Sequence, residues 1–432
     1  MKVATFPILA VFITGALHAQ GPLTPPGPPG PTQKSLQEIW DKLQSAESMI
    51  SLQQQQISIL QQQNSALLEV GGANLPWQIL KVEGAVFQNG DPSLAFSPQG
   101  APAVAYVGVG NGSVHFAIQT AGGWLVRQVD GPEQAFWSPS LEFDTAGMPA
   151  VAYYSDGLVD MEEDEGLRIA RWNGTSWTRT LVALIDGGNN TSCDLEISPN
   201  GTLTIAYEDS ALNALRLATF VNGSWETETV TTNFEDGRRP SLAFRSDGVP
   251  AIAFQDPGDD HANGVYFAFK EGPTWTIETI VEESPDPEGS EDFGSPSLAF
   301  APDGRAAITY DSYTSGAELI YSSRDRPDDW TQSVVTTASD WGFKSTLAFT
   351  PSGAPSVGYL IDADAEESTS SICYAVLRGG TWHHERAGRI DFNNFESSSN
   401  MAIGPNGQPV IAFYHPDDNT VSIAMRGIFT SR

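Results

Sequence analysis

Short runs of large apolar residues at every second position recur along the chain, and turns rich in Gly, Pro, Asp and Asn separate them. The stretch SLAFSPQGAPAVAY, residues 93–106, is representative, because two apolar runs flank a turn that ends at Gly100. Alternation at every second residue places large side chains on one face of a strand. A glycine at the end of a short turn supplies the left-handed backbone conformation that the connection needs. The pattern predicts a β-hairpin.

The hairpin pattern returns at intervals of about 50 residues, a period typical of repeat proteins and propellers. The turns of the six further copies also end at glycine: Gly147, Gly201, Gly248, Gly304, Gly353 and Gly407. A third apolar run follows each hairpin, and in six repeats a fourth run opens with tryptophan: Trp124, Trp177, Trp225, Trp275, Trp330 and Trp382. Each repeat therefore predicts a four-stranded antiparallel sheet with two apolar faces. Such sheets bury both faces when they stack around an axis as a β-propeller.

The last repeat lacks a tryptophan strand, whereas an unassigned run around Trp77 precedes the first repeat. We predict that this run is the fourth strand of the last sheet, so that the first and last strands of the fold pair. The predicted fold is therefore an all-β, seven-bladed propeller of four-stranded antiparallel blades over residues 75–432. An open β-solenoid is the alternative, but it needs no N-terminal strand to complete its C-terminal unit.

Three different segments precede the predicted propeller. Residues 1–19 place Lys2 before an apolar run that ends in small residues, which is typical of a secretory signal peptide. Residues 20–34 are rich in Pro and Gly and predict a stiff linker. Residues 35–70 carry apolar side chains at most a and d heptad positions, which predicts an α-helical coiled coil. We expect the chain to form a homo-oligomer through this coiled coil. The Gly-Pro-Pro pattern of the linker favours a trimer over a dimer.

The net charge limits the classes of partner that this chain is expected to bind, and the two cysteines bear on whether it forms a disulfide. The chain has 53 acidic and 22 basic residues and a formal net charge of −31. Affinity for nucleic acid and for anionic lipid depends on Lys and Arg, so neither is an expected partner. Beyond residue 19 no run approaches the roughly 18 apolar residues of a membrane span, so no transmembrane segment is expected. Cys193 and Cys373 fall in different repeats, which predicts two buried free thiols rather than a disulfide.

The connections to the fourth strands carry a partial family signature. The sequences NGTSW (173–177), EGPTW (271–275) and GGTW (379–382) resemble the Asp-box, or BNR repeat, of bacterial sialidase-like propellers. Trp172 and Lys270 stand where that box has its aspartate in two of them. The resemblance implies the propeller fold rather than an activity, because the box is a structural turn in that family. The Gly-Pro-rich leader resembles those ahead of coiled coils in bacterial cell-surface and tail-fibre-like proteins.

Antiparallel strands place successive connections alternately at the two faces of a propeller. The connections after the first and third strands are short and uniform, whereas those after the second and fourth strands are long, variable and acidic. Ligands are therefore expected on the variable face. In six repeats an aspartate follows the second-strand aromatic residue: Asp156, Asp209, Asp256, Asp311, Asp362 and Asp417. These carboxylates suit sugar hydroxyls or Ca²⁺, the one cofactor considered, but aspartate at such a place also caps turns. No metal ligand set is assigned.

Aromatic residues precede several of the first strands. Four of them are the candidates for stacking against sugar rings at the mouth of the central channel: Phe136, Trp137, Trp341 and Phe343. Wedging between adjacent blades is the favoured role for the set as a whole, which includes Phe293, because most blades have such a residue.

Together these features predict an exported or cell-surface binding or adhesion protein that recognises glycans or proteins through its variable face. A sialidase-like or other polysaccharide-acting hydrolase on the same scaffold is the alternative. A sialidase needs several arginines that converge on a carboxylate, and Arg238 and Arg239 are the only paired arginines expected in the variable loops. The sequence shows no Ser-His-Asp spacing, phosphate loop or zinc signature, so no catalytic residue is assigned.

Overall fold

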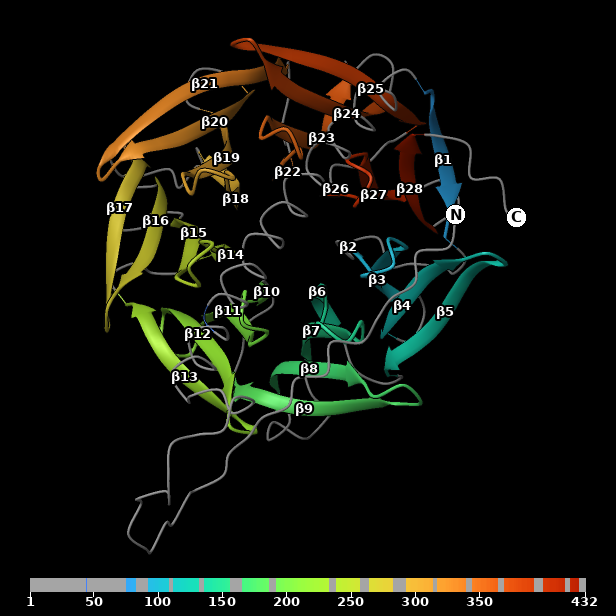
Figure 1. The fold of residues 1–432 in the computed structure, drawn as a ribbon, viewed down its shortest axis with the longest axis vertical. Coiled ribbons are helices and arrows are strands. Elements are labelled where there is room, and N and C mark those ends of the chain that lie inside the picture. The colour runs from blue at the N-terminus through green and yellow to red at the C-terminus, as the bar shows by residue number, and fades with distance from the viewer. Residues whose placement is uncertain are drawn as a thin grey trace, which may run out of the picture. The chain divides into compact units, whose positions relative to one another are not determined.

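Seven sheets arranged around a common axis form the folded body of the protein. The computed structural model describes Gln44 and residues 75–82, 92–108, 112–131, 136–155, 165–185, 192–232, 238–256, 264–282, 293–313, 317–338, 344–363, 369–391, 399–415 and 420–426. The described residues contain 28 strands, which form seven four-stranded antiparallel sheets (Figure 1). The predicted seven-bladed all-β propeller is confirmed.

The blades are numbered here in chain order. Blade 1 comprises β2 (Ser93–Phe96), β3 (Pro102–Gly108), β4 (Ser113–Thr120) and β5 (Gly123–Asp130), and blade 2 comprises β6 (Phe136–Phe143), β7 (Pro149–Ser155), β8 (Gly166–Trp172) and β9 (Trp177–Leu184). Blade 3 comprises β10 (Cys193–Ile197), β11 (Leu203–Asp209), β12 (Ala214–Val221) and β13 (Ser224–Thr231), and blade 4 comprises β14 (Arg238–Phe244), β15 (Pro250–Asp256), β16 (Gly264–Glu271) and β17 (Thr274–Glu282). Blade 5 comprises β18 (Phe293–Phe300), β19 (Ala306–Ser312), β20 (Ala317–Arg326) and β21 (Asp329–Ala338), and blade 6 comprises β22 (Ser345–Phe349), β23 (Pro355–Ala363), β24 (Thr369–Arg378) and β25 (Thr381–Asp391). Blade 7 comprises β26 (Ser399–Ile403), β27 (Pro409–His415), β28 (Thr420–Arg426) and the N-terminal β1 (Trp77–Lys81).

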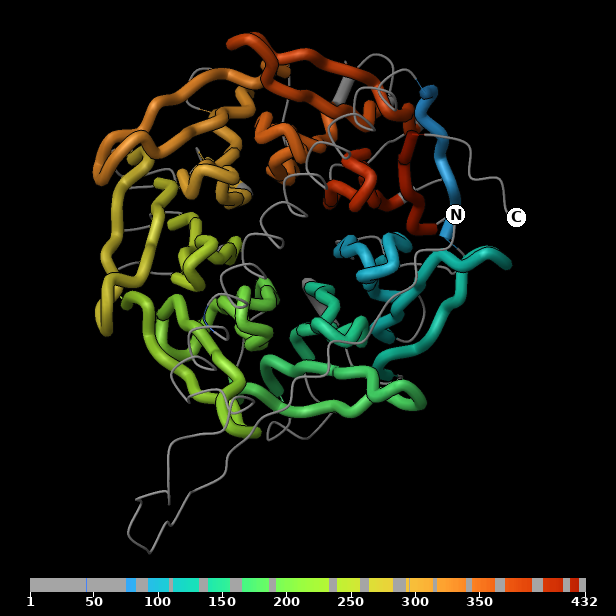
Figure 2. The backbone as a smooth tube through the Cα atoms, viewed as in Figure 1, coloured from blue at the N-terminus to red at the C-terminus, as the bar shows by residue number. Residues whose placement is uncertain are grey.

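The first strand of the fold completes the last blade. β1 pairs antiparallel with β28, and Ile79 lies opposite Ala424. The blue and red ends of the propeller therefore lie side by side in Figure 2. Trp77 takes the place of the fourth-strand tryptophans, since its ring packs on Tyr374 of blade 6 with 5.9 Å between ring centroids. The predicted closure is confirmed, and an open solenoid is excluded.

A contact between an acidic residue, an arginine and a tryptophan, here called a clasp, occurs both inside the chain and at the closure. The two clasps join Arg324 and Trp330 of blade 5 to Glu278 of blade 4, and Arg426 and Trp77 of blade 7 to Glu385 of blade 6. In each, the tryptophan Nε1 donates to the carboxylate, at 3.0 Å in the first and 3.1 Å in the second. The arginine lies directly opposite the tryptophan on the neighbouring strand. β1 is thus held by the same contacts as a fourth strand within the chain.

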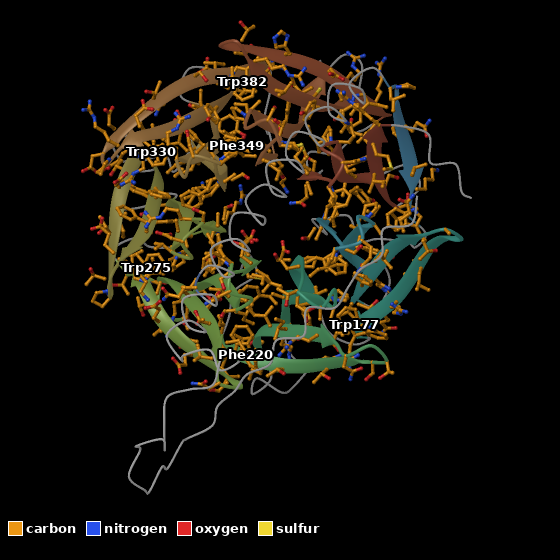
Figure 3. All side chains as sticks on the ribbon, viewed as in Figure 1. Trp177, Phe220, Trp275, Trp330, Phe349 and Trp382 are labelled. Atoms are coloured by element: carbon orange, nitrogen blue, oxygen red, sulfur yellow. The ribbon has the colours of Figure 1, made fainter. Side chains whose placement is uncertain are left out.

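The hydrophobic core lies between the blades. Every residue of the second strands β3, β7, β11 and β19 is buried, as expected for a sheet covered on both faces. One apolar cluster fills each of the seven interfaces. Four of the fourth-strand tryptophans lie in the outer part of the ring in Figure 3: Trp177, Trp275, Trp330 and Trp382. They pack on the preceding blade; the ring centroids of Trp330 and Phe267, for example, are 5.2 Å apart. This packing gives a structural role to the tryptophans that carry the family resemblance.

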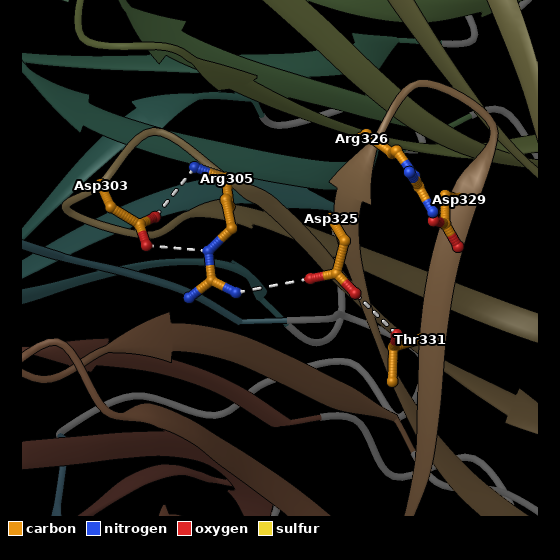
Figure 4. A network of polar contacts seen from close by, with 6 residues as sticks. All are labelled: Asp303, Arg305, Asp325, Arg326, Asp329 and Thr331. Atoms are coloured by element: carbon orange, nitrogen blue, oxygen red, sulfur yellow. Dashed lines mark hydrogen bonds and ion pairs between the residues drawn. The ribbon is translucent and has the colours of Figure 1, made fainter.

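The connections after the first and third strands form one face, here called the turn face. All seven predicted turn glycines have φ between 75° and 87°, and each donates its N–H to the carbonyl three residues earlier at 2.7–2.8 Å. In blade 5, Arg305 joins the two turns, with Nε 2.8 Å from Asp303 and Nη1 3.7 Å from Asp325 (Figure 4). Exposed ion pairs of this kind contribute only about 0–1 kcal/mol each. The regular turn face therefore depends mainly on the glycines.

The segments predicted before residue 71 lie outside the described residues, apart from Gln44, which is helical and exposed. The signal peptide, the linker and the coiled coil stay predictions. Among the described residues, no helix is long and apolar enough to cross a membrane. Both cysteines are free, as predicted, but only Cys193 is buried, whereas Cys373 is half-buried.

Candidate functional site

A ring of hydrogen bonds joins the first strands, which are the innermost strands in Figure 1. At six of the seven interfaces, a side-chain oxygen near the start of one first strand accepts a backbone N–H of the next blade: Leu94 to Asn400 (2.8 Å), Leu141 to Ser93 (2.9 Å), Leu195 to Ser140 (2.9 Å), Leu242 to Asp194 (2.7 Å), Leu298 to Ser241 (3.0 Å) and Leu347 to Ser297 (3.0 Å). At the seventh, Thr346 Oγ1 donates to the carbonyl of Ser399 at 3.5 Å. Each such bond stabilises the fold by about 1 kcal/mol. The ring fixes the angular spacing of the blades.

Three carboxyl groups depart from the repeat on these inner strands. Glu142 and Glu196 occupy a position that is alanine in the other five blades, and Asp194 replaces the usual serine or threonine nearby. Burial and then the charge of Asp194 raise the pKa of Glu142 to about 8, against the N–H of Phe143. Burial also raises the pKa of Asp194 to about 6, and burial with both neighbours raises the pKa of Glu196 well above its usual value. In the described part of the chain, no basic side chain pairs with any of the three.

The opposite face, where second strands end and first strands begin, is here called the loop face. In blades 3 to 5 the last residues of the second strands are polar, and none is more than 7% exposed: Glu208, Asp209, Gln255, Asp256, Asp311 and Ser312. We name this set the polar belt. The same two positions in blade 1 hold Val107 and Gly108. Strand formation does not require polar residues there, because the flanking blades cover both faces with apolar side chains.

Several members of the polar belt have specific partners. Asp209 Oδ2 lies 3.2 Å from Nη1 of Arg216, which is itself only 19% exposed. Gln255 Nε2 donates to the carbonyl of Phe293 in blade 5 at 2.6 Å. Tyr313 Oη donates to Asp311 Oδ2 at 3.5 Å. The contact from Gln255 crosses from blade 4 to blade 5, whereas those of Asp209 and Asp311 lie within their own blades.

Arg239 adds a cation to the loop face, in a strained backbone conformation. Its φ is +50°, whereas the other described non-glycine residues with positive φ are Asn213, Asn222 and Asp328. Asn and Asp adopt this region readily, but for other side chains it costs about 1 kcal/mol or more. A register shift between Arg238 and Ser241 marks a β-bulge, and the N–H of Arg239 donates to Ser192 Oγ of blade 3 at 2.9 Å. The bulge and this bond hold an exposed arginine at the start of β14.

The structure places only part of the predicted site. Asp209, Asp256 and Asp311 lie inside strands β11, β15 and β19, buried at their loop-face ends. The side chains of the remaining predicted residues lie outside the described residues, so their roles stay predictions: Phe136, Trp137, Trp341, Phe343, Asp156, Asp362 and Asp417. Phe293, from the same aromatic set, is buried against Tyr310, with ring centroids 6.1 Å apart. It takes the wedge role between blades 4 and 5 that the sequence favoured for this aromatic set.

Two features were missed or misplaced by the sequence reasoning. Arg238 and Arg239 were expected in a variable loop, but they open strand β14, because the bulge extends the strand beyond the apolar run. Glu142 and Glu196 were not singled out, although an alignment of the seven repeats shows alanine at the other five positions. The described residues contain no group of three or more His, Cys, Asp or Glu placed to hold a metal ion. The Ca²⁺ hypothesis stays a prediction for the loops.

Comparison with solved structures supports the fold. An ulvan lyase of polysaccharide lyase family PL25, solved bound to a GlcA(1-4)Rha3S ligand, aligns with a TM-score of 0.53 and 11% identity over 80% of this chain and 94% of that one. The polysaccharide lyase Uly1 aligns with a TM-score of 0.50 and 11% identity over 80% and 91% of the two chains. The NanB sialidase from Streptococcus pneumoniae aligns at 0.42 and 11% identity over 81% and 70%, too weakly to compare residues. No protein-family model matches the chain, and no curated protein does. These likenesses establish a shared propeller fold alone.

Proposed function

We propose that the protein is an exported or cell-surface propeller that binds glycans on the loop face of blades 3 to 5. The polar belt is the observation that carries this proposal. Buried polar side chains lower stability unless hydrogen bonds compensate them, so their concentration at one end of three adjacent blades indicates a use beyond folding. Carboxylate and amide oxygens accept hydrogen bonds from sugar hydroxyls, which supports a carbohydrate as the ligand.

The fold adds general support to this proposal. Two polysaccharide lyases share the architecture with TM-scores of 0.53 and 0.50, so a ring of this kind accommodates sugar chains in other proteins. The predicted coiled coil of residues 35–70 suits an adhesion role, because several copies on one stalk raise the avidity of weak individual sites.

A glycan array with the full-length chain tests the proposal. We expect retention of a defined subset of glycans and weaker retention by Arg239→Asn, which removes an exposed guanidinium of the loop face and suits its left-handed backbone. Asp247→Asn is the matched control, because Asp247 lies on the turn face with its side chain 54% exposed. An array on which no glycan is retained contradicts glycan binding, and equal loss in both variants contradicts the loop face as the site.

A polysaccharide-acting hydrolase is the second candidate, and one observation favours it. The pKa of Glu142 is raised to about 8 beside Asp194, whose pKa is about 6, and a protonated carboxyl group beside an ionised one suits general acid catalysis. Turnover of fluorogenic glycosides that disappears in Glu142→Gln supports this candidate. Turnover that persists in Glu142→Gln rejects this acid.

A further inference from the structure

The dipeptide Asn-Gly recurs in the connections of this chain, and it is a chemically reactive pair. Asparagine is thermolabile because the backbone nitrogen of the next residue attacks its side-chain amide carbon. A following glycine favours the attack, since it has no side chain to block the approach. Seven such pairs occur in the sequence, at Asn89, Asn111, Asn173, Asn200, Asn222, Asn263 and Asn406. The structure describes both residues of the pairs at Asn173, Asn200, Asn222 and Asn406.

Two of these four pairs are restrained at both reacting groups. Asn200 and Asn406 lie in turns after first strands, where the glycine N–H donates to the carbonyl three residues earlier at 2.8 Å. Asn200 Oδ1 also accepts from Ser198 Oγ at 2.5 Å and from Thr202 Oγ1 at 2.8 Å. Asn406 Oδ1 accepts from the N–H of Gln408 at 3.1 Å. Because the attack has to break these hydrogen bonds, the fold protects both asparagines.

The pair at Asn173 is restrained at the side chain alone. Asn173 Oδ1 accepts from Thr175 Oγ1 at 2.8 Å and from the N–H groups of Thr175 and Ser176 at 2.9 Å each, and Asn173 Nδ2 donates to Ser176 Oγ at 3.2 Å. The N–H of Gly174, in contrast, has no partner among the residues that the structure describes. This pair is therefore protected less completely than the first two.

The pair at Asn222 is restrained at neither group. Asn222 and Gly223 form the tip of the β12–β13 hairpin, between the paired residues Val221 and Ser224, with φ of +51° and +89°. Positive φ at both central residues is typical of the type I′ turn, which Asn-Gly favours. Asn222 is exposed, and within the described part of the chain neither its side chain nor the N–H of Gly223 has a hydrogen-bond partner. Space around the glycine is open as well, since a Cβ there would meet no atom within 4 Å.

We infer that Asn222 is a site of spontaneous deamidation and that it reacts fastest of the four described Asn-Gly pairs. The nitrogen of Gly223 forms a bond to Cγ of Asn222, and the side-chain nitrogen leaves as ammonia with the proton that Gly223 loses. Water then opens the resulting succinimide ring at either carbonyl, which yields aspartate or isoaspartate. Either product adds one negative charge to the turn face of blade 3. Aspartate still suits the left-handed backbone, whereas isoaspartate lengthens the main chain by one atom and is incompatible with the tight turn.

Peptide mapping of the full-length chain by mass spectrometry tests the inference. The folded protein is incubated at mildly alkaline pH, and the conversion of amide to carboxylic acid is followed over time in the peptides that contain the four pairs. We expect Asn222 to react roughly 10-fold or more faster than Asn200 and Asn406, because the attack there has to break at least two hydrogen bonds. Asn173 is expected to react at an intermediate rate.

The chain unfolded in guanidinium chloride is the reference, because the four pairs there differ only in sequence, and we expect their rates to converge. Thr175→Val is the matched variant, since it removes one donor to Asn173 Oδ1 with little change in shape; it should speed the reaction at Asn173 and leave that at Asn222 unchanged. The inference is overturned if Asn222 reacts no faster than Asn200 and Asn406 in the folded chain. It is also overturned if the same ranking persists in the unfolded chain, because the turns would then not be its cause.

Discussion

The clasp at the closure of the ring predicts a measurable coupling between Arg426 and Trp77. These residues lie opposite each other on β28 and β1, and the guanidinium carbon is 4.9 Å from the centre of the Trp77 ring. The side chain of Arg426 is 3% exposed, so its interaction with the ring is largely protected from water. A cation over a tryptophan ring in such a setting contributes about 1–2 kcal/mol. We expect a coupling free energy of that size between Arg426→Met and Trp77→Leu in a double-mutant cycle.

The single arginine variants are expected to differ in a defined order. Removal of one partner of a fully buried ion pair costs about 3–5 kcal/mol, because the other charge stays buried. In Arg324→Met the carboxylate left behind, Glu278, has a side chain that is 2% exposed, so the full loss is expected. In Arg426→Met it is Glu385, whose side chain is 39% exposed and keeps contact with water. The loss there is expected to be smaller, about 2–3 kcal/mol.

Equilibrium urea unfolding of the full-length chain, followed by far-ultraviolet circular dichroism, measures these free energies. The cycle of Arg324→Met with Trp330→Leu serves as the internal reference, because it probes the same clasp within continuous blades. If Arg324 and Trp330 are coupled but Arg426 and Trp77 are not, β1 does not complete blade 7 in solution. The reasoning on closure would then be refuted.

The inner strands and the polar belt yield three further predictions. Glu142→Ala with Glu196→Ala restores the residue of the other blades. Both folded pKa values lie above their unfolded values, so the wild type is destabilised at high pH. The rise of the Glu142 pKa to about 8 corresponds to roughly 4 kcal/mol at pH 8.5, so the double variant should be more stable by on the order of that amount, and the gain should vanish near pH 4.5 in a series of unfolding curves. Ser241→Ala leaves the backbone N–H of Leu298 in blade 5 without its acceptor, so the free energy of unfolding should fall by about 1–3 kcal/mol. Ser246→Ala, on an exposed turn, should change it very little. Equal effects of the two variants in thermal unfolding would argue against the hydrogen-bonded ring. Asp209→Asn leaves a largely buried arginine without its counter-charge, so a loss of about 1–3 kcal/mol in urea unfolding is expected, and no loss would show that this ion pair is not formed.

The sequence carried most of the information on the fold because the fold is repeated. Each of the seven hairpins has the same alternation of apolar residues and the same turn glycine. A single apolar run could belong to a strand or to a helix, but seven copies of the same pattern resolve that ambiguity. Closure followed from a missing strand at one end and an extra one near Trp77 at the other, and the register of β1 on β28 agrees with it. The aromatic residues were harder to assign, since a ring that wedges between blades and a ring that stacks on a sugar have the same local sequence.

The candidate site was less predictable because its residues are exceptions to the repeat. A polar residue after a buried strand reads as a turn cap, so the burial of Asp256 and Asp311 inside strands could not be inferred from their position alone. The left-handed backbone of Arg239 depends on a bulge and on Ser192 of another blade, and neither leaves a mark in the local sequence.

The pairing of β1 with β28 means that the ring closes only once the last of the described strands has been made. β1 leaves the ribosome before the other strands between residues 75 and 426, whereas its partner β28 is the last of them to be made. Until then β1 has an unpaired edge, and such edges recruit strands from other molecules. A chain that stops before residue 420 can never satisfy that edge, so prematurely terminated copies are expected to aggregate or to be degraded rather than to accumulate as partial rings.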